Sequence, residues 1–215
     1  MPFGYPVFLE LRGRRALVVG RGAVAEGKVE GLLAAGSEVV VVADGPEETL
    51  VALEELDGVT VERRAFQAED LDDVDICVAW SSSAEERDTI AREARARGVL
   101  VNVMDDVPNC DFAAPAVVRR GDLVIAISTG GKSPALAKRL REELSKRFGP
   151  EWEEVMRLLG EVRAETLAAL PDLPERSKRW SRALDLDEAE ELMREGRADE
   201  LRSRLVARLI GEGAA

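Results

Sequence analysis

Gly20, Gly22 and Ala25 follow the apolar run 15–19 at the spacing of a glycine-rich turn between a strand and a helix. In the pattern G-x-G-x-x-G/A, the first glycine makes a tight turn and the second lets the backbone approach a pyrophosphate, while a small third residue permits close helix–strand packing. Free N–H groups at the helix start would then face the phosphates. The three positions therefore predict a strand, a phosphate-binding loop and a helix.

Asp44 is placed for a second contact with a nucleotide. It follows the β-branched run 38–42, about twenty residues after Ala25, where an acid accepts hydrogen bonds from the adenosine ribose. Its charge would repel the additional phosphate of NADP, so we expect NAD as the cofactor. The alternative is a glycine turn with a structural role only. The expected contacts come from Gly20, Gly22, Ala23, Val24, Asp44 and Gly45.

The predicted elements that position these residues alternate as in a parallel, doubly wound α/β sheet. Strands are expected at 15–19, 38–42, 59–63, 74–79 and 99–103, and helices at 24–35, 46–56 and 84–97. Beyond residue 113, the runs 116–119 and 123–127 predict an antiparallel pair, Ser133 caps a helix to Phe148, and only helical periodicity follows. We therefore predict a Rossmann-like NAD-binding domain at 1–113, a small α+β region at 114–148 and a helical C-terminal domain at 149–215.

The composition of the 215-residue chain excludes several classes of protein. A net charge of −12 argues against general binding of nucleic acid or of anionic membranes. No apolar run approaches the ~20 residues that span a bilayer, and the first residues lack the pattern of a signal peptide. Cys77 in a predicted buried strand and Cys110 in a predicted loop are more typical of free thiols than of a disulfide. We therefore expect a cytoplasmic protein.

Several segments are similar to those of one enzyme family. They are Asn102-Val103-Met104-Asp105, Pro115-Ala116, the run from Ser128 to Pro134, the run 20–28 and the pair Arg179-Trp180. Through them nearly the whole chain resembles the dehydrogenase family of sirohaem synthase, whose members oxidise precorrin-2 and in some cases also insert ferrous iron. The resemblance implies an NAD-dependent precorrin-2 dehydrogenase that makes sirohydrochlorin.

The same resemblance carries expectations about assembly and about two departures. It implies a homodimer formed near residues 114–148, with a helical tail that helps to enclose the tetrapyrrole. Relatives commonly have Ala-Thr where this chain has Ala79-Trp80, so contacts near the nicotinamide differ. Some bifunctional members have a serine where Thr129 stands, which leaves open how this position selects between the two activities.

Asp105 is the candidate catalytic residue. It follows a predicted strand at the carboxyl edge of the sheet, where open α/β sheets bind ligands, and a carboxylate there can act as a general base. The alternative is a helix or turn cap, which is also the interpretation for neighbouring Asp106. The resemblance favours catalysis, because the aspartate at this place is essential in relatives.

A basic segment in an acidic chain is the candidate substrate site. Residues 119–147 contain eight Lys and Arg side chains but only three acids, and a tetrapyrrole with carboxylate arms suits such a segment. Gly130 and Gly131 add backbone donors before a helix start. The expected substrate contacts are Arg119, Arg120, Thr129, Gly130, Gly131, Lys132 and Ser133. The alternative is a solvated helix face, which we favour for Lys146 and Arg147 at the helix C-terminus.

The tryptophans, the absence of histidine and the function itself each allow an alternative interpretation. Trp152 and Trp180 either stack on a flat macrocycle or, as we favour, anchor the core. The chain has no histidine, so we expect no preformed imidazole metal site; Fe²⁺ would enter only as a substrate, and we favour dehydrogenation alone. A non-catalytic NAD-sensing module is the alternative function, but it would not need the basic segment.

Overall fold

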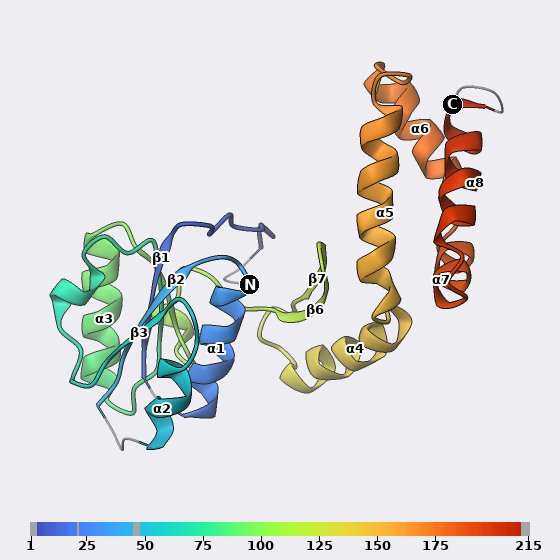
Figure 1. The fold of residues 1–215 in the computed structure, drawn as a ribbon. Coiled ribbons are helices and arrows are strands. Elements are labelled where there is room, and N and C mark those ends of the chain that lie inside the picture. The colour runs from blue at the N-terminus through green and yellow to red at the C-terminus, as the bar shows by residue number, and fades with distance from the viewer. Residues whose placement is uncertain (1–3, 21, 45–47, 212–215) are drawn as a thin grey trace. The chain divides into compact units, whose positions relative to one another are not determined.

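The computed structural model describes residues 4–20, 22–44 and 48–211 (Figure 1). By its internal contacts the chain divides into two compact units, residues 1–114 and 115–215. The first unit is a sheet with helices on both faces, and the second contains a two-stranded ribbon and five helices. The predicted fold class is therefore confirmed.

The first unit is built on a five-stranded parallel sheet with the order β3-β2-β1-β4-β5. Its strands are β1 (Arg15–Val19), β2 (Glu38–Val42), β3 (Val59–Glu62), β4 (Ile76–Ala79) and β5 (Leu100–Val103). Its helices are α1 (Ala23–Leu33), α2 (Glu48–Glu54) and α3 (Ala84–Ala96), with 3₁₀ turns η1 (Ala68–Leu71) and η2 (Val107–Asn109). The chain runs from β1 outward to β3 and then returns to β4, so the carboxyl ends of β1 and β4 meet at the point where the strand order reverses.

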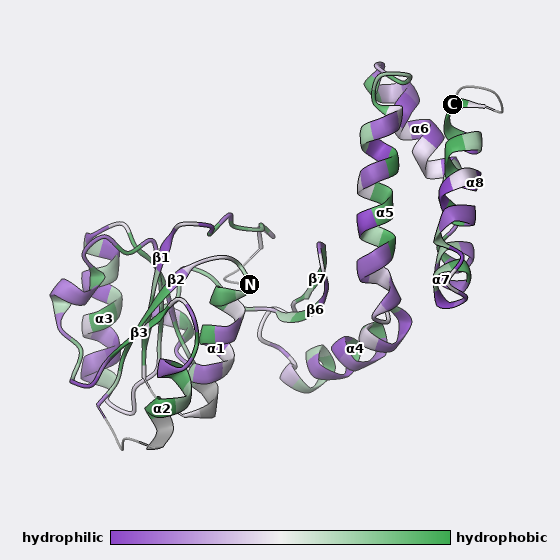
Figure 2. Ribbon diagram, in the orientation of Figure 1, coloured by the Kyte–Doolittle hydropathy of each residue, from purple (hydrophilic) through white to green (hydrophobic). Residues whose placement is uncertain are grey.

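Both faces of the sheet are buried at β1 and β4, which explains why these strands are nearly continuous apolar runs (Figure 2), whereas the edge strand β3 is only partly buried. Side chains alternate along a strand, so Leu17 and Val19 pack with residues of α3 while Ala16 and Val18 pack with residues of α1 and α2. Cys77 lies on the α3 face and is fully buried, and this burial raises the pKa of its thiol to about 12. The prediction that Cys77 is a core residue is confirmed.

The predicted elements of this unit are present, with shifts at their ends. The strand expected from residue 74 begins at Ile76, and the 3₁₀ turn η1 was not expected. Ser83 caps α3, because its hydroxyl accepts a hydrogen bond from the Glu86 N–H at 3.3 Å. Such shifts of one or two residues are typical of element ends, where local hydrogen bonds compete with the regular pattern.

The second unit begins with an antiparallel ribbon and a long helix. The ribbon strands β6 (Ala116–Arg120) and β7 (Leu123–Ile127) pair with Ala116 opposite Ile127, and α4 spans Pro134–Arg147. The Ser133 hydroxyl accepts a hydrogen bond from the Leu136 N–H at 3.2 Å, so Ser133 caps α4 as predicted. Helix α4 contains no buried residue, and Val118 is the buried hydrophobic residue of the ribbon.

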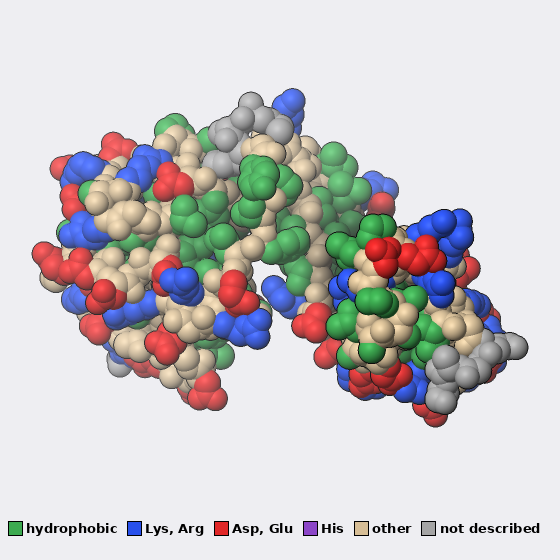
Figure 3. Space-filling model, turned by 90° about the horizontal axis from the view of Figure 1, so that it is seen from above, with side chains coloured by type: hydrophobic (Ala, Val, Ile, Leu, Met, Phe, Trp, Pro, Cys, Tyr) green, Lys and Arg blue, Asp and Glu red, His purple; other side chains and the backbone are tan. Residues whose placement is uncertain are grey.

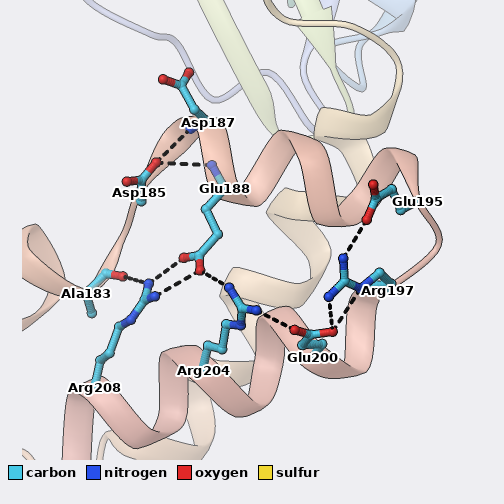
Figure 4. A network of polar contacts seen from close by, with 9 residues as sticks. All are labelled: Ala183, Asp185, Asp187, Glu188, Glu195, Arg197, Glu200, Arg204 and Arg208. Atoms are coloured by element: carbon cyan, nitrogen blue, oxygen red, sulfur yellow. Dashed lines mark hydrogen bonds and ion pairs between the residues drawn. The ribbon is translucent and has the colours of Figure 1, made fainter.

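Four helices complete this unit around their own core. They are α5 (Glu151–Thr166), α6 (Leu173–Ala183), α7 (Leu186–Arg194) and α8 (Ala198–Ile210). Trp152 is 3% exposed within this core, and Trp180 packs against it. The interpretation of both tryptophans as core anchors is confirmed by this packing. Glu188 of α7 pairs with Arg204 and Arg208 of α8, and these ion pairs tie the last two helices together (Figure 4).

Acidic and basic side chains are mixed on the surface, as Figure 3 shows. In that view the acidic side chains therefore form no single acidic face, although the chain carries a net charge of −12. None of the helices in the described ranges is long and apolar enough to cross a membrane.

Candidate nucleotide site and catalytic carboxylate

Gly20 lies where the three central strands end. Its N–H donates to the Val42 carbonyl of β2 at 3.0 Å, and on the other side the Trp80 N–H donates to the Val19 carbonyl at 2.8 Å. With φ at 127°, Gly20 has a backbone conformation that side chains rarely adopt, and a Cβ there would lie 3.0 Å from the Trp80 carbonyl oxygen. Only glycine fits this turn without displacing the end of β4.

Gly22 is the N-cap of α1 and has φ at 79°, again in the region that favours glycine. The N–H groups of Ala25 and Glu26 both donate to its carbonyl, at 2.9 and 3.2 Å, which starts the helix. Ala23 is the first helical residue and Val24 the second, so their N–H groups belong to the first turn, which has no intrahelical acceptors. Among the described residues, a Cβ on Gly22 would meet no atom within 4 Å.

A cleft of about 220 Å³ lies at the carboxyl ends of the first four strands. Its lining includes Gly20, Asp44, Arg64, Phe66, Trp80 and Ser81. Of the predicted cofactor residues, Gly20 and Asp44 therefore meet in one cleft, and Gly22 starts the helix beside the same loop. Gly45 was also predicted but lies outside the described residues. The glycine turn, the open helix start and the acid at the second strand suit a dinucleotide with its pyrophosphate at α1.

Arg64, Phe66 and Glu86 also line the cleft and were not among the predicted site residues. Arg64 and Phe66 follow β3, and Glu86 belongs to the first turn of α3. The sequence carried a weak signal for them, because parallel strands end on one edge of the sheet and residues after β3 must therefore lie near those after β2. No motif identifies which of these residues enters the cleft.

Asp105 lies two residues beyond β5 in a turn, and its φ is 61°. This left-handed conformation is uncommon for a side-chain-bearing residue, although aspartate tolerates it better than most. The side chain is exposed, and within the described ranges its carboxylate makes no hydrogen bond or ion pair. The turn therefore presents an unpaired carboxylate at the carboxyl edge of the sheet, which is the arrangement that a general base requires.

Asp106, in contrast, is a structural residue. Its carboxylate accepts hydrogen bonds from Arg87 Nε at 2.9 Å and from Asn109 Nδ2 at 3.2 Å, which hold the pKa of Asp106 below its ordinary value. Arg87 also donates to the Ser81 carbonyl at 2.9 Å. This arginine thus connects the loop after β5 with the loop after β4, and the latter lines the cleft.

Cys110 is directed back into this turn. Its thiol donates to the carbonyls of Val103 at 3.0 Å and Asp106 at 3.3 Å, and burial raises its pKa. Asn102 donates to the Phe112 carbonyl at 2.7 Å and lies 3.5 Å from the Cys110 sulfur. Both side chains therefore hold the segment that follows β5, as the interpretation of Cys110 as an ordinary loop thiol predicts. Within the described ranges, no three Cys, Asp or Glu side chains are arranged to hold a metal ion.

The predicted substrate residues all lie in the second unit, in β6 and in the loop before α4. Arg119 and Lys132 are exposed, whereas Arg120 is tied to its own unit. The Arg120 guanidinium donates to the carbonyl and the hydroxyl of Ser145, at 3.0 and 2.8 Å. This arginine therefore fastens the ribbon to α4 and has less freedom than Arg119 and Lys132 to reach a ligand.

The loop before α4 is held by its own hydroxyl groups. The Ser133 N–H donates to Thr129 Oγ1 at 3.2 Å, and that hydroxyl also lies 3.2 Å from the Ser133 carbonyl. Gly130 and Gly131 both have positive φ, at 60° and 76°, so this turn depends on glycine. The Gly130 N–H donates to the Ser128 hydroxyl and the Lys132 N–H to the Thr129 carbonyl, both at 3.2 Å. Most polar groups of the loop are thus used within it, which leaves the Gly131 N–H and the Lys132 side chain as the expected donors to an anion.

Two family models match the chain. One, described as "Putative NAD(P)-binding", covers residues 7–116, just over half of the chain, and the other, described as "Sirohaem biosynthesis protein central", covers residues 120–147. A nicotinamide dinucleotide as cofactor is thereby confirmed at the level of NAD(P).

Individual proteins agree with these models. The chain is 34% identical over 195 residues to a siroheme synthase of Methylococcus capsulatus and 32% identical over 210 residues to one of Chromobacterium violaceum. These alignments cover 91% and 98% of this chain but 41% and 44% of the relatives, so the chain spans about two fifths of their length. A solved structure named "SirC, precorrin-2 dehydrogenase" is 28% identical, with a TM-score of 0.60 and 95% coverage of both chains. The resemblance seen in the sequence is confirmed by these similarities, and the chain belongs to the family whose model is described as "Putative NAD(P)-binding".

Proposed function

We propose that the protein is an NAD-dependent dehydrogenase that converts precorrin-2 to sirohydrochlorin. The observation that carries the proposal is the similarity to a precorrin-2 dehydrogenase over 95% of both chains, which includes the ribbon, α4 and the C-terminal helices as well as the nucleotide domain. An NAD-sensing module would share the glycine turn and Asp44 but has no need for the second unit.

The reaction removes one hydride and one proton from precorrin-2, so that precorrin-2 and NAD⁺ give sirohydrochlorin, NADH and H⁺. Bound NAD⁺ accepts the hydride. The chain must therefore orient the reduced ring toward the cleft, exclude water and accept a proton. Asp105 is the proposed proton acceptor, because its carboxylate is unpaired, whereas that of Asp106 is engaged by Arg87.

NAD is the preferred cofactor in this proposal, and Asp44 is the residue that selects it. Asp44 is exposed and lines the cleft after β2, where an acid accepts hydrogen bonds from the ribose and repels a 2′-phosphate. Gly20, Gly22, Ala23 and Val24 form the turn and helix start for the pyrophosphate, and Gly45 is proposed from the sequence alone.

The carboxylate arms of the substrate are bound by the ribbon and the loop before α4. Arg119 and Lys132 supply exposed cations, and Gly131 supplies a backbone N–H, whereas the N–H of Gly130 shapes the loop by donating to the Ser128 hydroxyl. Thr129 and Ser133 shape the loop through their mutual hydrogen bonds, and Arg120 holds the ribbon on α4.

A homodimer formed through residues 114–148 completes the proposal. In this segment Val117 is 38% exposed, Leu136 is 49% exposed and α4 has no buried residue, so a second copy would cover apolar surface that this chain leaves in water. Sedimentation of the purified protein at several concentrations tests the dimer independently of activity.

The test of the function is anaerobic incubation of the purified protein with NAD and precorrin-2, followed by absorbance of NADH and of sirohydrochlorin. A dehydrogenase forms both products above the spontaneous rate, whereas an NAD-sensing module binds NAD and forms neither. Addition of Fe²⁺ to sirohydrochlorin in a parallel sample tests metal insertion, for which we propose no activity above the spontaneous rate. Metal insertion that is lost in Asp105→Ala would overturn this last point.

A further inference from the structure

We propose that Asp70 is a specificity-determining residue, which excludes NADP by keeping the guanidinium of Arg64 occupied. The proposal deepens the NAD preference stated above and rests on the cleft being the nucleotide site. It concerns a residue outside the glycine turn and outside the strand end that carries Asp44.

Arg64 lies beside the place where the adenosine ribose is expected. It lines the same cleft as Asp44 and follows β3 by two residues. The Ala43 N–H donates to the Glu62 carbonyl at 3.1 Å, so the backbone that leads to Asp44 runs alongside the backbone that leads to Arg64. In Rossmann-type sites that accept NADP, an arginine near this place binds the 2′-phosphate. The chain therefore contains a cation of the kind used for NADP although Asp44 favours NAD.

Both terminal nitrogens of the Arg64 guanidinium are already paired with a carboxylate. Nη1 donates to Asp70 Oδ2 at 2.8 Å and Nη2 donates to Asp70 Oδ1 at 2.6 Å, which is the bidentate geometry that a phosphate would otherwise use. The nearest oxygen of Glu62 lies 3.7 Å from Arg64 Nε and adds a second negative charge. Because two carboxylates surround one guanidinium, Arg64 offers no net positive charge to a ligand.

Asp70 is fixed in place more firmly than Arg64. Its side chain is 8% exposed against 36% for Arg64, and it also accepts a hydrogen bond from the Gln67 N–H at 2.8 Å in the capping box of η1. Burial raises the pKa of Asp70, but the hydrogen bonds from Arg64 and Gln67 outweigh this effect and hold the pKa below its ordinary value. The carboxylate is therefore charged at neutral pH and holds Arg64 against η1.

The test is the binding of NAD and NADP to Asp70→Asn, measured by calorimetry and without any tetrapyrrole. Asparagine keeps the shape of the side chain and an acceptor for Gln67 but removes the charge that holds Arg64. We expect the affinity for NADP to rise about tenfold, as one charge-assisted pair is released, while the affinity for NAD changes by less than about threefold. The double variant Asp70→Asn with Arg64→Gln should lose the gain.

Asp72→Asn is the matched control. Asp72 follows the same 3₁₀ turn and accepts a hydrogen bond from Arg97 Nε at 3.0 Å, but neither residue lines the cleft. This control should leave both affinities unchanged. A gain in NADP affinity that is equal in Asp72→Asn, or that survives in the double variant, would assign the effect to net charge and overturn the proposal.

A second pair of variants covers the case that Asp70→Asn does not fold. Asp44→Asn should improve NADP binding, and adding Arg64→Gln to it should change nothing further, because Asp70 still holds Arg64. If Arg64→Gln removes the improvement, Arg64 reaches the 2′-phosphate despite Asp70 and the proposal fails. A parent protein that binds NAD, combined with no gain in Asp70→Asn, overturns this proposal alone; a parent that binds neither nucleotide overturns the nucleotide site and the proposal together.

Discussion

Arg87 donates its Nε–H to the carboxylate of Asp106 at 2.9 Å, and this ion pair separates the roles of two adjacent aspartates. The Asp106 side chain is 19% exposed and holds the turn after β5, whereas Asp105 is exposed and, within the described part of the chain, has no polar partner. The ion pair of Asp106 therefore fixes the backbone turn that presents the carboxylate of Asp105.

Asp105→Asn is therefore expected to abolish turnover and to spare cofactor binding. Loss of a general base typically lowers kcat by about 10²–10⁴-fold. Asparagine tolerates the positive φ of this position, so the fold should persist. The measurement is kcat for precorrin-2 oxidation together with the Kd for NAD. Near-normal kcat in the folded variant would exclude Asp105 as the proton acceptor, and loss of NAD affinity would give it a structural role.

Asp106→Asn is the matched control for that experiment. It removes the ion pair with Arg87 but leaves the amide able to accept a hydrogen bond. We expect a lower melting temperature and a loss of kcat smaller than that of Asp105→Asn. A loss as large as that of Asp105→Asn, with stability unchanged, would contradict the division of roles.

Gly20→Ala should damage the nucleotide site. A Cβ at Gly20 would lie 3.0 Å from the Trp80 carbonyl oxygen, and a φ of 127° is strained for alanine. Strain of this kind costs about 1–2 kcal/mol, so we expect lower stability and weaker NAD binding, measured by thermal melting and calorimetry. Gly27→Ala in α1 is the control, because a Cβ there meets nothing within 4 Å and alanine should stabilise the helix by about 0.5–1 kcal/mol. Equal behaviour of the two variants would argue against the strained turn.

The basic segment gives a prediction that separates binding from folding. Replacing Arg119 and Lys132 together by glutamine should raise the KM for precorrin-2 roughly 100-fold with little change in stability, since two charge-assisted contacts of about 1.5 kcal/mol each are lost. Arg120→Gln should instead lower the melting temperature, because Arg120 donates to the carbonyl and hydroxyl of Ser145. Arg92→Gln removes one exposed charge from α3 and should leave KM unchanged. An unchanged KM with a disturbed dimer in the Arg119 and Lys132 variant would assign these residues to the subunit interface.

Glu188 makes the stability of the C-terminal helices depend on pH. Hydrogen bonds from Arg208, and then from Arg204, lower the pKa of Glu188 to about 2 from its ordinary 4.5. A lowered pKa means that the ion pairs stabilise the fold above about pH 4.5 and that this contribution is lost as the pH falls through about 2. Glu188→Gln should therefore lower Tm by about 2–4 °C at pH 7, and the difference from the parent should shrink below pH 4.5. A difference that is independent of pH would indicate lost packing instead of lost charge.

The sequence predicted the sheet because its signals are local. The glycine turn at Gly20, the β-branched run before Asp44 and the serine cap at Ser83 each act through neighbours in the chain. The core of the sheet was predictable for the same reason, since strands that are buried on both faces are apolar throughout.

The rest of the site depends on contacts between residues that are distant in the chain. Arg87 pairs with Asp106, and Arg120 donates hydrogen bonds to Ser145. Each of these contacts joins different elements, so no residue spacing in the sequence predicts it. The positive φ of Asp105 likewise belongs to the turn that the Arg87–Asp106 ion pair holds. From the sequence alone, Arg120 was therefore expected to have the same role as Arg119, although only Arg119 of the two is exposed.

Oxidation of precorrin-2 with NAD by this chain is tested most directly by the stoichiometry of the reaction. Purified protein is mixed with NAD and a limiting amount of precorrin-2 under anaerobic conditions, and NADH and sirohydrochlorin are quantified by absorbance. We expect one NADH for each sirohydrochlorin formed, at a rate that falls to the spontaneous level in Asp105→Asn. A folded protein that binds NAD but forms no NADH above the spontaneous rate would contradict it.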